Sequence, residues 1–206
     1  MNTFNNDQKL KYMLLESAKE HQEADRYLKG TYGEETEDGW KGCAVGCAIK
    51  TLNDKLGKDY NTGDHFVLEK ELSVPEWLWR LEDTIFEGLP SDKASKWPVR
   101  FIEAIPVGKT VEEMNRVKWQ FCSFVLEENI ERVLTLNIDE ALKEEVVNAI
   151  RGVLNVHDKA ITTGEWDESA AASARSAASA ASAASAAYEK YANKLVELLE
   201  DGKLVR

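Results

Sequence analysis

The sequence predicts an all-α protein, a single-domain bundle of seven or eight helices that ends in a long Ala/Ser-rich helix. Apolar residues recur at three- and four-residue spacing, helix-start and helix-stop residues punctuate the chain, and no stretch alternates as a strand does. The chain has 206 residues, enough to bury a self-sufficient core. We expect a helical body over residues 1–165, and the Ala/Ser-rich helix over residues 166–206, packed on the body or on a second copy.

Glycines punctuate the first third of the chain. The apolar spacing predicts one helix over residues 8–28 and a second over residues 40–56, each followed within two residues by a glycine. A polar, acidic loop over residues 31–39 separates them. A short helix is expected to begin near Asp64 and to end at Leu72.

Capping boxes mark the later helices. A Ser, Thr or Asn followed three residues later by Glu begins the segments at Ser73, Thr110 and Asn137. A further helical segment spans residues 91–106 and is interrupted at its Trp-Pro pair. The last helix is expected over residues 167–201.

The Ala/Ser block sets this last helix apart. Residues 169–187 comprise 12 Ala, 6 Ser and one Arg, and from Ser173 on a serine stands at every third position. Because each residue advances about 100° around an α-helix, such serines spiral and form no fixed polar face. The block is either a surface for close packing or a solvated spacer. A second group of small residues, over residues 42–48, also favours close packing. We expect this segment to be buried against a neighbouring helix, and the Ala/Ser helix is one candidate.

Composition excludes several classes of protein. The net charge of −11 disfavours binding to nucleic acid or to anionic lipid. Three cysteines form no disulfide framework, and the polar N-terminus shows no signal peptide, so we expect a cytoplasmic protein. We expect no cofactor, no membrane segment, and a protein partner or self-association through the Ala/Ser helix.

Two pairs of residues suggest chemistry. His21 and Asp25 lie one helical turn apart, as do Cys43 and Cys47, so two facing helices would present a set of ligands that suits zinc. The alternative is a thiol nucleophile, Cys43 or Cys47, activated by His21 or His65. A start of the helix near Cys43 would lower the pKa of its thiol. The simplest interpretation is that both cysteines are small core residues.

Several stretches resemble an uncharacterised family of bacterial and bacteriophage proteins. The matching segments include His21–Asp25, Lys41–Cys47, Pro75–Asp83 and Trp97–Phe101, followed by the Ser/Ala triplets before Tyr188. The resemblance implies a phage or prophage setting. It carries no catalytic role, because no activity is associated with that family.

The leading hypothesis is a non-enzymatic binding protein, a phage or prophage accessory factor that acts on a host component. The alternative is a Cys/His-dependent or zinc-dependent hydrolase. The candidate binding residues are Gly42, Cys43, Gly46, Cys47, His21, Asp25 and His65.

Overall fold

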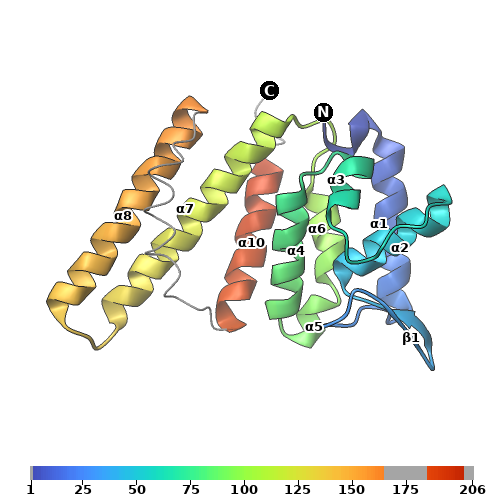
Figure 1. Ribbon diagram of the computed structural model, residues 1–206, viewed down its shortest axis with the longest axis horizontal. Coiled ribbons are helices and arrows are strands. Elements are labelled where there is room, and N and C mark those ends of the chain that lie inside the picture. The colour runs from blue at the N-terminus through green and yellow to red at the C-terminus, as the bar shows by residue number, and fades with distance from the viewer. Residues whose placement is uncertain (1, 165–184, 202–206) are drawn as a thin grey trace. The chain divides into compact units, whose positions relative to one another are not determined.

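The computed structural model confirms the all-α prediction. It describes residues 2–164 and 185–201, and these form nine α-helices, one short 3₁₀ helix and one two-stranded hairpin (Figure 1). The α-helices are α1 (Gln8–Glu23), α2 (Ala44–Leu56), α3 (Phe66–Leu72), α4 (Glu76–Gly88), α5 (Ser91–Ala94), α6 (Trp97–Ala104), α7 (Val111–Thr135), α8 (Glu140–Thr163) and α10 (Ser185–Asp201). The 3₁₀ helix is η1 (Thr3–Asn6), and the strands are β1 (Glu34–Thr36) and β2 (Gly39–Lys41).

The chain divides into two compact units. Unit 1 comprises residues 1–111 together with residues 185–206, and unit 2 comprises residues 112–184. The boundary expected at residue 165 falls outside the described residues. The units divide instead where α7 begins and where α10 begins, so unit 1 is assembled from two separate stretches of sequence.

The core of unit 1 lies among α1, α2, α4 and α6, because each of these helices turns an apolar stripe inward. Trp79 and Phe86 from α4 and Phe101 from α6 are each at most 1% exposed. The rings of Trp79 and Phe101 meet edge to face, with centroids 5.3 Å apart. Leu14 from α1 and Leu52 from α2 complete this layer.

The β1–β2 hairpin is absent from the sequence prediction. The helix expected over residues 40–56 begins only at Ala44, because Trp40 lies in β2 and pairs antiparallel with Glu35. Gly39 ends the turn with a φ of 99°, a conformation that side chains with a Cβ rarely adopt. Strands of three residues are too short to show a detectable alternation.

The helix α10 packs on the helices of unit 1. Of the helix expected over residues 167–201, residues 167–184 lie outside the described part of the chain, and α10 covers the rest. α10 lies against α4 and α6, and its Leu195 is fully buried. A Cβ added at Gly88 would lie 2.3 Å from the ring of Tyr188, so glycine allows this ring to approach α4 closely.

Small residues at the start of α2 also permit a close contact. Residues 42–48 are buried, as predicted. A Cβ added at Gly46 would lie 1.9 Å from the backbone oxygen of Tyr32, so only glycine fits here. The neighbour at Gly46 is therefore the loop before β1, and the prediction of a neighbouring helix is wrong at this position.

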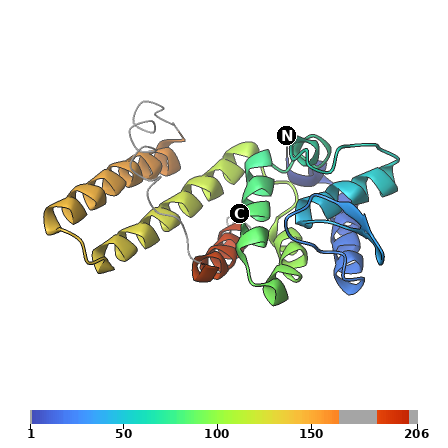
Figure 2. The same ribbon diagram turned by 60° about the horizontal axis from the view of Figure 1, so that its bottom comes forward.

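Unit 2 contains α7 and α8, which run antiparallel side by side (Figures 1 and 2). The carboxylate of Asp139 caps α8 and accepts hydrogen bonds from the N–H groups of Ala141 and Leu142 at 3.0 and 3.1 Å. An apolar cluster joins the two helices. Its buried members are Leu126, Val133, Val147, Ile150 and Val153.

Candidate functional site

Cys43 stands at the N-cap of α2, so the sequence correctly places it near a helix start. Its Sγ accepts a hydrogen bond from the N–H of Gly46 at 3.4 Å, and its own N–H donates to the Thr31 carbonyl at 2.7 Å. One turn later, the Cys47 thiol donates to the Gly42 carbonyl at 3.5 Å. Both cysteine residues are only 1% exposed.

Asp83 on α4 collects three side chains from different segments. The Tyr32 hydroxyl donates to its Oδ2 at 3.2 Å, and His65 Nε2 lies 3.4 Å from the same oxygen. The Cys43 thiol lies close enough to this carboxylate to lower its pKa. Burial tends to raise the pKa of Asp83, but the nearby His65, Cys43 and Tyr32 side chains outweigh burial and lower the pKa. The structure therefore joins Cys43 and His65, two predicted site residues, through an acid that the sequence analysis did not select.

This arrangement does not activate a thiol. In a Cys/His pair the imidazole takes the thiol proton, whereas here Asp83 lies between Cys43 and His65. Burial raises the pKa of Cys47 to about 12 and that of Cys43 at least as strongly. The N–H of Gly46 lowers the pKa of Cys43 by less than burial raises it. The expectation that the helix start makes this thiol acidic is therefore wrong.

The four residues of the expected zinc set do not converge. His21 Nε2 lies 3.1 Å from the Thr51 hydroxyl, within the interface of α1 and α2. The Asp25 side chain is 90% exposed, and its nearest charged partner is Lys41, at 3.7 Å. Among residues 2–164 and 185–201, no three His, Cys, Asp or Glu side chains are placed to hold a metal ion. The geometry gives the zinc alternative no support.

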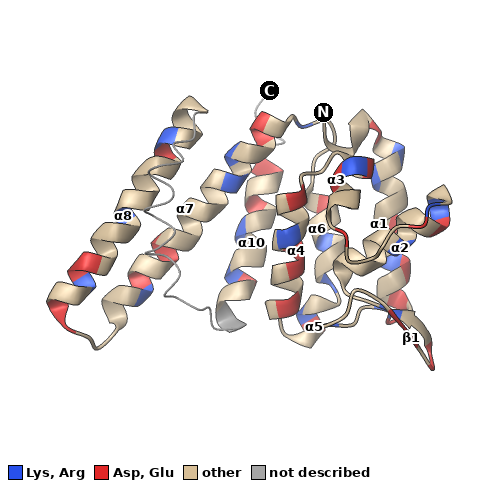
Figure 3. Cartoon of the chain, viewed as in Figure 1, with Lys and Arg blue, Asp and Glu red and all other residues tan. Residues whose placement is uncertain are grey.

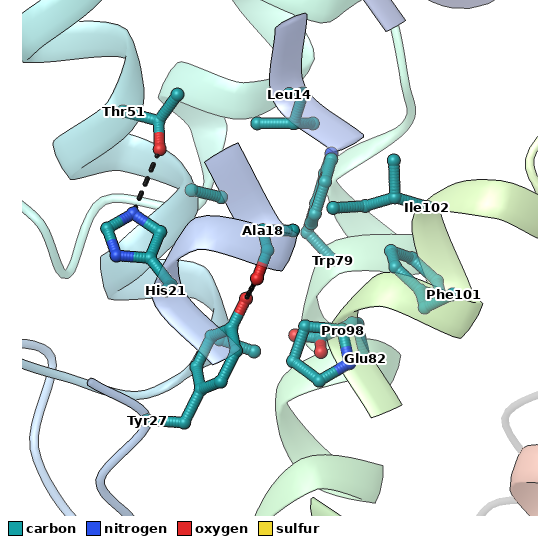
Figure 4. A pocket seen from close by; sticks show the side chains of 12 residues that line it. Leu14, Ala18, His21, Tyr27, Thr51, Trp79, Glu82, Pro98, Phe101 and Ile102 are labelled. Carbon is teal, nitrogen blue, oxygen red and sulfur yellow. Dashed lines mark hydrogen bonds between the residues drawn. The ribbon is translucent and has the colours of Figure 1, made fainter. Parts of the chain in front are cut away.

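A small pocket in unit 1 contains a residue that the sequence analysis overlooked. Helices α1, α2, α4 and α6 line it, and Figure 4 shows His21, Tyr27 and Glu82 on its wall. Glu82 is only 1% exposed. A signal for this burial is present in the sequence, because Glu82 continues the apolar stripe of Leu78 and Ile85 at helical spacing.

The α7–α8 turn exposes a group of large apolar side chains, which we call the hairpin tip. Leu134, Leu136, Ile138 and Leu142 are 55%, 45%, 37% and 49% exposed, respectively. They fall within nine positions of one another in the sequence. Elsewhere in the described chain, the exposed large apolar residues are scattered through unit 1 and its edge; they are Tyr12, Tyr32, Leu56, Phe66 and Val111.

Comparison of the chain with protein-family models, with curated proteins and with solved structures finds no match in any of the three. In the described part of the chain, no helix combines the length and apolar composition needed to cross a membrane. The site residues must therefore be interpreted from their own geometry.

Proposed function

We propose that the protein acts by binding another protein through the hairpin tip. The observation that carries this proposal is the grouping of four exposed large apolar side chains at one turn. Exposing them to water costs free energy that a partner would recover by covering them. Apolar patches of this kind mark interaction sites on soluble proteins.

The charges around the hairpin tip favour a particular kind of partner. Five acidic residues surround the turn, against two basic ones, and Figure 3 shows this excess at the start of α8. The acidic residues are Glu131, Asp139, Glu140, Glu144 and Glu145, and the basic residues are Arg132 and Lys143. We infer a partner with an apolar groove edged by Lys or Arg, because such a rim complements the acidic tip.

A hydrolase is a weaker candidate. Its best support is the contact of Cys43 and His65 with one carboxylate. Cys43 and Cys47 are buried, however, and His65 and His21 contact Asp83 and Thr51. The resemblance to bacteriophage proteins supports a binding factor that acts on a host component in the cytoplasm. Self-association through the Ala/Ser helix stays a prediction.

Photocrosslinking tests the proposal in bacterial cells. A benzophenone amino acid at Leu136 should yield a crosslinked partner, and the same group at Tyr12, which is 60% exposed in unit 1, should not. The purified partner should bind the double variant L136S/I138S at least about tenfold more weakly than wild type, because two apolar contacts are lost. Y12S serves as the matched control and should bind as wild type does.

Three outcomes would contradict the proposal. One is equal crosslinking from Tyr12 and Leu136, and another is unchanged affinity of L136S/I138S. The third is a crosslink whose only product is a second copy of this chain. That result would assign the hairpin tip to self-association and would exclude a partner whose groove is edged by Lys or Arg.

A further inference from the structure

The pocket in unit 1 is lined by polar atoms that lack hydrogen-bond partners. In the part of the chain that the structure describes, neither carboxyl oxygen of Glu82 has a partner, nor does Nδ1 of His21 or Nε1 of Trp79. All three residues line the pocket and are buried. Buried polar groups are almost always paired with protein or with ordered water, so three residues with unpaired groups around one pocket require an explanation.

The charge state of these groups is settled by their surroundings. Burial raises the pKa of Glu82 well above its usual value, and the negative charges of Asp83 and Glu87 on α4 raise it further. From α1, His21 contributes no positive charge at neutral pH, because burial lowers its pKa to about 4. Both effects favour the protonated, uncharged form of the Glu82 carboxyl, which can donate a hydrogen bond.

No Lys or Arg is among the residues that line the pocket in the described part of the chain. Tyr27 follows α1, and Cys47 comes from α2; burial raises the pKa of both, so both are neutral. The pocket residues from α6 are Pro98, Phe101 and Ile102, none of which titrates. Figure 4 shows Tyr27, Phe101 and Ile102 around the pocket together with Glu82.

The pocket has space for a very small molecule. About 10 Å³ is open to the centre of a water-sized molecule, which corresponds to about one water. Acceptors are also present, because the Tyr27 hydroxyl donates to the Ala18 carbonyl at 3.1 Å and keeps its own oxygen lone pairs.

We propose that this pocket is a binding site for one uncharged, water-sized polar molecule, which is water in solution, and that the Glu82 carboxyl holds it. The bound water accepts the carboxyl proton in a hydrogen bond and donates to acceptors on the wall. Purely apolar cavities of this size stay empty, so the carboxyl decides whether the pocket is hydrated.

A matched pair of variants tests this proposal. High-resolution crystal structures of the full chain should show an ordered water within hydrogen-bond distance of Glu82 in wild type and of the amide in E82Q. In E82M, which has similar length and no polar oxygen, the water should be absent. In solution, water-to-protein NOEs to the indole N–H of Trp79 should be present in wild type and E82Q and absent in E82M.

Two results would overturn the proposal. An empty pocket in wild type, or a Glu82 carboxyl bonded directly to a protein group, would show that no water is held. A water that persists in E82M would show that the carboxyl does not hold it. If E82M does not fold, wild type and E82Q alone still decide between an occupied and an empty pocket.

Discussion

His21 and Glu82 should give unit 1 two opposite pH dependences that cancel in the wild-type protein. The pKa of His21 is lowered from 6.5 to about 4 in the fold, so between these values only the unfolded chain binds the proton. This group destabilises the fold as pH falls from 6.5 towards 4. The pKa of Glu82 is raised well above 4.5, so above pH 4.5 only the fold keeps the proton, and this group destabilises the fold as pH rises.

The magnitudes follow from the size of these displacements. Each group changes the free energy of unfolding by up to about 1.4 kcal/mol per pH unit, and both act fully near pH 5.5 with opposite signs. Glu82→Gln should therefore reveal a stability that rises by about 3 kcal/mol from pH 4 to 6.5. His21→Gln should reveal a stability that falls as pH rises above 4.5, because the raised pKa of Glu82 is then no longer offset by His21. The lowered pKa of Asp83 acts below its usual value of 3.8, outside this window.

Urea unfolding at several pH values provides the assay. The double variant H21Q/E82Q is the control and should again show little pH dependence. Comparing all four proteins removes contributions that they share, including that of His157, whose pKa is also lowered by burial. If both single variants keep the wild-type slope, neither group is held neutral in the fold, and the reasoning is refuted.

Three further changes test the packing and the thiols. Gly46→Ala should destabilise unit 1 by about 1–3 kcal/mol in urea unfolding, because its Cβ would meet the backbone of Tyr32; a variant as stable as wild type would show that this loop does not rest on α2. Leu195→Ala should cost about 2–5 kcal/mol, because Leu195 is fully buried, whereas a loss below about 1 kcal/mol would mean that α10 is not seated on unit 1. Cys43 and Cys47 should react with a thiol reagent only in denaturant, and rapid labelling of the native protein would contradict their burial.

Helix punctuation predicts most of the fold. The end of α2 at Leu56 before Gly57 and the start of α7 after Thr110 follow the expected stop and cap residues, because these signals act within one turn of the chain. The expected caps Asn137 and Ser73 are wrong, because Asp139 caps α8 and Ser73 ends α3 in a left-handed conformation. The β1–β2 hairpin escapes prediction, since its two strands gain their order from pairing and not from a local pattern.

The site is less predictable, because its residues meet through tertiary contacts. Sequence spacing places Cys43 at a helix start, but it contains no information that Asp83 lies between Cys43 and His65. Glu82 was detectable in principle, because it occupies a position on the apolar stripe of α4 where a charged residue is out of place. The exposure of the hairpin tip could not be detected in the sequence. Apolar residues near a turn look the same in sequence whether they are covered or exposed.

The assembly of unit 1 from two separate stretches has a consequence for synthesis. A chain leaving the ribosome presents α4 and α6 early, but the helix that covers them, α10, follows only after the whole of unit 2 has been translated. Until then the surface of α4 at Gly88, which the Tyr188 ring contacts, is left uncovered by α10. Folding of unit 1 is thus completed only once α10 has been synthesised, and a chain interrupted before residue 185 would lack the helix that closes its core.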